Sequence, residues 1–160
     1  MNEEDIFQLE ESFEIAFSSI FRDAGCEHSY RSREPFDMDS TPWVESKFLP
    51  GAVNEKYRHY IDDTKPLVYA AWFGSILTVT VTTHRKNNGT QHKILIGKIR
   101  LACQRHKIIE SWPATAAGRI HRIADIREKG SVNTTDDENE LDKTEITFHL
   151  THNVSETAWT

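Results

Sequence analysis

Cysteine is scarce in this chain, and its scarcity excludes two classes of small protein. Cys26 and Cys103 are too few for a disulfide framework and have no zinc-binding spacing. The longest run without charge, residues 66–83, contains tyrosine, serine and several threonines, which makes it a poor membrane span. The N-terminus is acidic, whereas an export signal begins with basic residues. We therefore expect a soluble, reduced, intracellular protein that does not enter a membrane.

Motifs of enzyme chemistry are also missing. The sequence has no G-x-S-x-G, no phosphate-binding loop and no G-x-G-x-x-G. Its eight histidines include no pair four residues apart, so no metal site is predicted. Cys103 lies on the apolar stripe of a predicted helix and is expected to be a small core residue. Cys26 follows a helix end, where the negative dipole would not activate a thiol. We predict no catalytic residue, no metal and no cofactor.

Acidic side chains are absent from one long segment. Residues 64–109 hold eight bases and no acid, although the whole chain has 25 acids, 19 bases and a net charge of −6. This segment can form a basic surface that meets nucleic acid or the acidic surface of a neighbouring copy. It can equally fold against acidic segments of its own chain. A pI near 5.7 is not typical of a free DNA-binding domain.

The remaining patterns predict one domain of the α+β class, since 160 residues is a usual domain length. Apolar residues recur at helical spacing over 3–22, and Gly25 is a natural stop for that helix. The order of elements is α-β-β-α-β-β, which favours an antiparallel β-sheet flanked by two α-helices, with a long acidic hairpin loop. The other predicted elements are strands at 43–49, 67–83, 119–128 and 144–152, a helix at 91–106 capped by Thr90, a polar loop at 52–66, and mobile loops at 26–42 and 130–143.

Several segments, taken in order, carry a resemblance to a known family. They are the N-terminal amphipathic helix, Trp43–Gly51 (WVESKFLPG), Tyr69–Val81 (YAAWFGSILTVTV), a helix starting near His92, Ile123–Gly130 (IADIREKG), the acidic loop, and Asp142–Trp159. In this order they resemble the tail-terminator or tail-completion proteins of tailed bacteriophages.

The resemblance implies a structural virion protein rather than an enzyme. The implied fold is an α+β domain with an antiparallel sheet flanked by helices, and no cofactor is implied. The implied function is a ring of copies, commonly a hexamer, that caps the finished tail tube and offers the surface that joins the head. Its implied partners are the tail tube protein and a head-completion or neck protein. Its implied location is the tail or neck of the virion, and the bacterial host cytoplasm during assembly.

A closed ring uses head-to-tail contacts, so each subunit needs two different complementary patches. Trp159, second from the C-terminus, either docks on its own domain or anchors on a neighbouring copy. The basic residues can instead line the lumen and make weak, sequence-independent contact with passing DNA. The candidate basic residues are Lys93, Lys98, Arg100 and Arg105, and the candidate acidic residues are Asp136, Asp137, Glu138 and Glu140.

Three rival functions remain open at this point. A head-completion or neck connector of the same particle would have a similar composition and would also form a ring. A small nucleic-acid-binding module predicts salt-sensitive DNA binding by the monomer, abolished by charge reversal at Arg100 and Arg105. A small metal-dependent enzyme predicts stoichiometric metal in the purified protein, which we do not expect.

Overall fold

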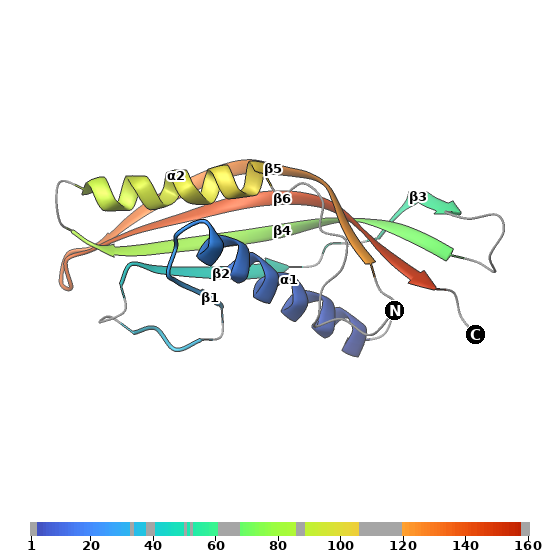
Figure 1. Ribbon diagram of the computed structural model, residues 1–160, viewed down its shortest axis with the longest axis horizontal. Helices are drawn as coiled ribbons and strands as arrows, with labels where there is room; N and C mark the ends of the chain where they lie inside the picture. The colour runs from blue at the N-terminus through green and yellow to red at the C-terminus, as the bar shows by residue number, and fades with distance from the viewer. Residues whose placement is uncertain are drawn as a thin grey trace.

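Two helices and one six-stranded sheet make up the described part of the protein, as the computed structural model in Figure 1 shows. The structure describes residues 3–32, 34–37, 41–49, 51, 53–60, 68–85, 89–105 and 120–157. In chain order the elements are α1 (Glu3–Asp23), β1 (His28–Arg31), β2 (Trp43–Leu49), β3 (Val53–Tyr60), β4 (Val68–His84), α2 (Thr90–Arg105), β5 (Ile120–Asp136) and β6 (Leu141–Thr157).

The predicted α+β class is confirmed, but the predicted order of elements is wrong. Two further strands, β1 and β3, come between α1 and β4. Both are polar, so neither has the apolar alternation that marks a strand in sequence, and each forms by pairing with a longer neighbour. The sheet runs β1-β2-β4-β6-β5, with β3 also paired to β4. It is mixed rather than antiparallel, because β1 runs parallel to β2.

The predicted acidic loop at 130–143 is also wrong. Residues up to Asp136 continue β5, β6 begins at Leu141, and a four-residue turn joins the two strands. Residues 127–135 are exposed on both faces of the strand. Their sequence therefore lacks the alternation of apolar and polar residues by which a strand is predicted. Pairing with β6, from Gly130 opposite Thr147 to Asp136 opposite Leu141, gives this stretch its strand conformation instead.

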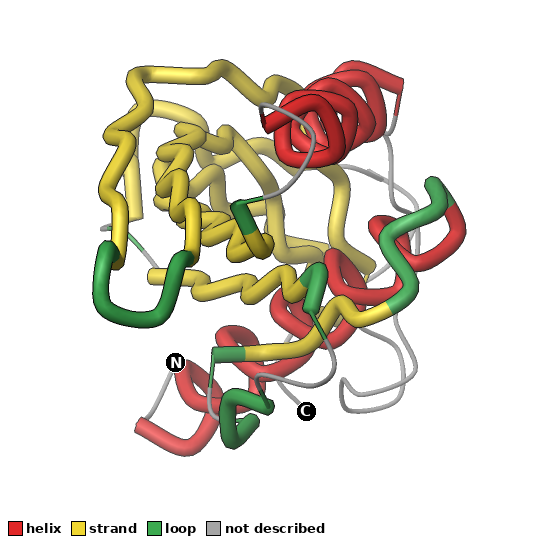
Figure 2. The backbone as a smooth tube through the Cα atoms, turned by 90° about the vertical axis from the view of Figure 1, so that its left-hand side faces the viewer, coloured by secondary structure: helices red, strands yellow, loops and turns green. Residues whose placement is uncertain are grey.

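The hydrophobic core lies between the two helices and one face of the sheet. Figure 2 shows both helices on one side of the strands. The Phe13 ring of α1 stacks on Phe48 of β2, with ring centroids 4.3 Å apart. Cys103 is buried in this core, as predicted. The main core residues are Phe13, Phe17 and Phe21 of α1, Phe48 of β2, Leu77, Val79 and Val81 of β4, Leu95 and Ile99 of α2, and Ile146, Phe148 and Leu150 of β6.

The end of α1 agrees with the predicted stop. Gly25 adopts a φ of 103°, a left-handed conformation that glycine takes without steric cost. The Cys26 N–H donates to the Phe21 carbonyl at 2.9 Å, and the Gly25 N–H donates to the Arg22 carbonyl at 3.0 Å. These two bonds satisfy carbonyls that would otherwise have no partner at the helix end.

The three longest strands reach well beyond α2. β4, β5 and β6 have 17 residues each, and in Figure 1 one end of these strands, together with β3, projects past the end of α2. β2 and β3 follow one another along the same edge of β4, because β2 pairs with residues 76–82 and β3 with residues 69–73. Gly51 lies at the junction and donates its N–H to Ser75 Oγ at 3.1 Å.

Candidate functional site

The described residues contain no set of side chains suited to metal binding or thiol chemistry. Among them, no group of three or more histidine, cysteine, aspartate or glutamate residues is placed to hold a metal ion. Burial raises the pKa of the Cys103 thiol to about 12. Burial also raises the pKa of Cys26, against the opposing effect of the Lys98 ammonium. Both thiols therefore remain protonated and unreactive near neutral pH, and the candidate site lies in the surfaces and polar contacts described next.

The acidic turn, residues 137–140, is a well-bonded structure. Asp136, just before the turn, accepts hydrogen bonds from the Asn139 N–H at 3.2 Å and from Asn139 Nδ2 at 2.8 Å. These bonds lower the pKa of the Asp136 carboxyl. Glu140 closes the turn with a φ of 53°, which is uncommon for a residue with a side chain.

Replacing Glu140 with glycine is expected to raise the free energy of unfolding by about 0.5–1 kcal/mol. Glycine adopts the left-handed conformation without the steric cost that other residues carry, and this gain outweighs the extra freedom of the unfolded chain. Urea denaturation followed by circular dichroism measures the change. Glu138→Gly is the matched control, because Glu138 has no positive φ, and this change should lower stability slightly. Equal effects of both substitutions would contradict the explanation.

Arg85, the residue that follows β4, meets the acidic turn within the chain. Its Nη2 donates to Asp137 Oδ1 at 2.8 Å, and its Nε lies 3.5 Å from Asp142 Oδ1. The Arg85 N–H also donates to the Glu140 carbonyl at 2.9 Å. One end of the acid-free segment therefore folds against acids of its own chain, which is one of the two alternatives that the sequence leaves open.

The four basic candidates of α2 have different surroundings. Arg100 makes a two-pronged ion pair with Glu128 of β5, with Nη2 and Nε lying 2.8 and 3.0 Å from its carboxylate oxygens. Lys98 reaches over the end of α1, where its ammonium lies against Gly25. Lys93 is exposed. Arg105 is the last residue of α2, and its side chain lies outside the described part.

The structure does not pair these basic residues with the acidic candidates. In the described part of the chain, no ion pair joins α2 to Asp136, Asp137, Glu138 or Glu140. Trp159 lies outside the described residues. The sequence reasoning missed Arg85 and Glu128 as partners. The contact of Arg85 with the acidic turn follows from the register of β4 and β6, in which His84 lies opposite Leu141, and a correct end point for β5 would have indicated it. The pair of Glu128 with Arg100 joins β5 to α2 and does not follow from that register.

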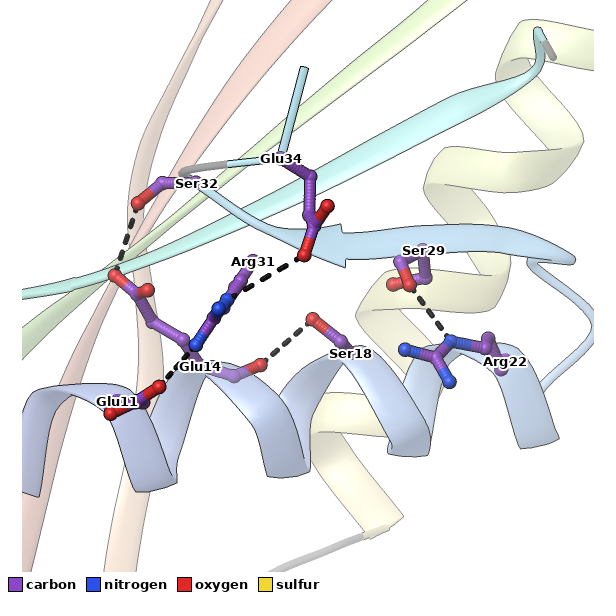
Figure 3. Close-up of polar contacts among 8 residues, drawn as sticks. All are labelled: Glu11, Glu14, Ser18, Arg22, Ser29, Arg31, Ser32 and Glu34. Atoms are coloured by element: carbon purple, nitrogen blue, oxygen red, sulfur yellow. Dashed lines mark hydrogen bonds and ion pairs between the residues drawn. The ribbon is translucent and has the colours of Figure 1, made fainter. Parts of the chain in front are cut away.

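A set of polar side chains fixes α1 against the β1 edge of the sheet (Figure 3). Arg22 Nε donates to the Ser29 carbonyl of β1 at 2.8 Å, and Arg31 is paired with Glu11. The Glu14 carboxylate is 3% exposed and accepts from the Phe48 N–H at 3.0 Å. The same oxygen lies 3.2 Å from Ser32 Oγ, which donates to it.

Glu14 acts here as a substitute for a missing strand partner. β1 ends at Arg31, opposite Ser46, so the outer side of Phe48 has no neighbouring strand residue in that ladder. A buried N–H without an acceptor is costly, and the carboxylate supplies the acceptor from the helix. This edge of the sheet is thereby closed by side chains of α1, an arrangement that guards against pairing with other strands.

A second buried polar chain fixes α2 to the sheet. His92, 9% exposed, lies 2.8 Å from Thr83 Oγ1 of β4 through Nδ1 and 2.6 Å from Thr144 Oγ1 of β6 through Nε2. The Thr144 hydroxyl donates to Asn133 Oδ1 at 2.8 Å. The Thr144 oxygen must therefore accept a hydrogen bond from His92 Nε2–H. The imidazole proton is then on Nε2, and Nδ1 accepts from the Thr83 hydroxyl. Four elements are linked by these three bonds.

Acid is expected to weaken the fold through His92. Burial lowers its pKa below the ordinary value of 6.5, and the Asp142 carboxylate opposes this effect. The unfolded chain therefore binds the proton first, and the free energy of unfolding falls as the pH drops from about 6.5 toward the folded-state pKa. Urea denaturation at pH 7.5 and 5.5 should show this loss, and His92→Gln should reduce it. Asp142→Asn should enlarge it, and an unchanged loss in both variants would exclude His92 as the cause.

Large apolar side chains are exposed on several separate surfaces of the described residues, and Ile15, on the outer side of α1, is 39% exposed. On the open face of the sheet, which is the face away from the helices, Leu49 and Val132 are 56% and 61% exposed. On the outer side of α2, Ile94 and Leu101 are 53% and 45% exposed. Such residues are candidates for contact with another protein surface when they lie together.

The comparisons with known proteins leave these surfaces as the main indication of function. No protein-family model matches the chain, and the comparison with curated proteins found no significant match. Among the described residues, neither helix has the length and apolar character that crossing a bilayer requires.

Proposed function

We propose that this protein is a structural subunit of a tailed phage, a tail-terminator or tail-completion protein that forms a ring on the end of the tail tube. One observation carries the proposal: large apolar residues are exposed on surfaces that differ, with Ile94 and Leu101 on the outer side of α2 and Ile15 on the outer side of α1. A head-to-tail ring needs two unlike patches on each subunit. The tail tube protein and a head-completion or neck protein would be its neighbours along the particle axis.

The resemblance along the sequence supports the same proposal, and so does the reach of the long strands. β4, β5 and β6 extend past α2 together with β3, so each subunit offers a surface away from its helical layer. A head-completion or neck connector is the alternative within the same particle, and it would use a similar surface.

A nucleic-acid-binding module is the alternative of a different class, and the charge arrangement favours it less. Arg85 and Arg100 are both paired with acids of their own chain. These pairs reduce the positive potential available to phosphate groups. In the lumen of a ring, exposed Lys93 would make the contact with DNA, because such contact needs only weak attraction.

The solution mass of the untagged protein tests the proposal. Light scattering over a range of concentration and salt, with electron microscopy of any large species, should reveal a closed ring with a central hole. If the protein is monomeric throughout, purified tails and duplex DNA should be added to it separately. Binding to tail ends would support the terminator, whereas salt-sensitive DNA binding that is lost on charge reversal at Arg100 and Arg105 would support the nucleic-acid module.

A further inference from the structure

The outer side of α2 has the pattern of a helix that packs against another helix. Its exposed residues follow alternating spacings of four and three, which produces one straight stripe along a helix. The two large members, Ile94 and Leu101, lie seven residues apart, with Gly97 between them. We call this set the α2 outer stripe; it comprises Thr90, Ile94, Gly97, Leu101 and Gln104, all of which are exposed.

Gly97 is the residue of this stripe that the fold of the subunit does not explain. A glycine inside a helix costs about 1 kcal/mol relative to alanine. A Cβ atom at position 97 would meet no atom within 4 Å, so neighbouring groups do not require a glycine there. A glycine between two exposed apolar residues leaves a shallow place where the backbone or a side chain of another helix can approach closely.

Charge indicates which helix fits the stripe. α2 carries four basic residues and no acid, whereas α1 carries seven acids and one base. Within the subunit, Glu14 and Glu11 of α1 and Arg100 of α2 already have partners, so the opposite net charges of the two helices make the argument rather than these three side chains. The outer side of α1 also exposes Ile15, at 39%, with Ser19 and Asp23 exposed in the turns that follow. The acidic turn cannot serve in its place, because its residues, Asp137–Glu140, include no apolar side chain to cover Ile94 and Leu101.

We propose that the α2 outer stripe of one subunit packs against the outer side of α1, around Ile15, in a neighbouring copy. This inference rests on the proposed ring, for which it supplies the contact between subunits. The contact joins two unlike patches, as head-to-tail assembly requires. It buries apolar side chains at its centre, with exposed Lys93 and, on the partner helix, exposed Asp23 as its charged rim, a usual arrangement of apolar core and charged rim.

Disulfide cross-linking between two different variants tests the contact directly. Ile15→Cys protein is mixed under mild oxidation with Ile94→Cys or Leu101→Cys protein, while native Cys26 and Cys103 are buried. A covalent dimer should form in at least one mixture and in neither variant alone. Ile15→Cys mixed with Val132→Cys is the matched control, since Val132 is more exposed but lies on the open face. Equal dimer yield in the control mixture would overturn the inference.

Charge substitution provides the second test. Ile94→Asp should raise the dissociation constant of the assembly at least about tenfold and leave the melting temperature of the isolated subunit unchanged, and Val132→Asp should alter the constant less. An assembly of unchanged mass would overturn the α2 contact but leave the ring standing. A lowered melting temperature without a change in mass would show that the stripe is covered by its own chain. If the wild-type protein does not assemble and the cysteine variants do not cross-link, the contact is overturned. Binding to tail ends would then test the proposed function separately from the contact.

Discussion

Replacing Gly51 with alanine is expected to lower the free energy of unfolding by about 3 kcal/mol. A Cβ atom on Gly51 would lie 1.4 Å from the carbonyl oxygen of Gly74, which belongs to the backbone of β4 and cannot rotate away. The junction between β2 and β3 would have to move, and the hydrogen bond from the Gly51 N–H to Ser75 Oγ would be lost. Urea denaturation followed by circular dichroism measures the loss, provided that the slope with urea stays constant.

Gly74→Ala is the matched control for this prediction. A Cβ atom at position 74 would meet nothing within 4 Å, although Gly51 lies directly across from that residue. The control should therefore change the free energy of unfolding by less than about 1 kcal/mol, in the direction of a rise, because alanine restricts the unfolded chain. A Gly51→Ala protein as stable as the wild type would show that the two strands do not approach each other at this point.

Glu14→Ala is expected to have a comparable effect, a loss of about 3 kcal/mol. The substitution removes the acceptor of the Phe48 N–H and leaves that buried group without a partner, which costs more than an ordinary hydrogen bond contributes. It also removes the acceptor of the Ser32 hydroxyl and leaves a small cavity under α1. Denaturation by urea measures the loss, and hydrogen exchange at the Phe48 amide should become faster than in the wild type.

Two further variants separate this role from a general effect of charge. Glu14→Gln keeps an acceptor oxygen in nearly the same place, so it should cost about 1 kcal/mol. Glu11→Ala removes the neighbouring acid, whose side chain is 35% exposed and paired with Arg31. An exposed ion pair contributes little, so this loss should stay below about 1 kcal/mol. If Glu11→Ala were as damaging as Glu14→Ala, the buried acceptor would not be the explanation.

Elements with a long apolar pattern were predictable from the sequence. The stripe through Phe13 and Phe17 identified α1 to within one residue of its end, and the alternation through Leu77 and Val79 identified β4. β1 and β3 gave no such signal, because polar strands at the side of a sheet owe their conformation to the neighbouring strand. The second half of β5 was not predicted, for the same reason.

The polar contacts of the candidate site were predictable only in part. The uneven charge indicated that basic and acidic segments meet, but not that Arg85 is the residue that meets the acidic turn. Glu14 looked like one more acid in an acidic helix, and its role depends on the point at which β1 stops. His92 lay in a sequence with eight histidines and no spacing to distinguish it. Each of these roles depends on register between distant segments, which single-sequence patterns do not contain.

The long ladder between β4 and β6 has a consequence for how fast the chain can fold. All 17 residues of each strand are paired without a shift, yet α2 and β5 separate the strands in the chain. A large loop must close before the first of these pairs can form, and topologies dominated by such distant pairs fold slowly, in milliseconds to seconds. His92 bonds to both strands at once, through Thr83 and Thr144. α2 can therefore complete its attachment only after the two strands have met, which places its docking late on the folding pathway.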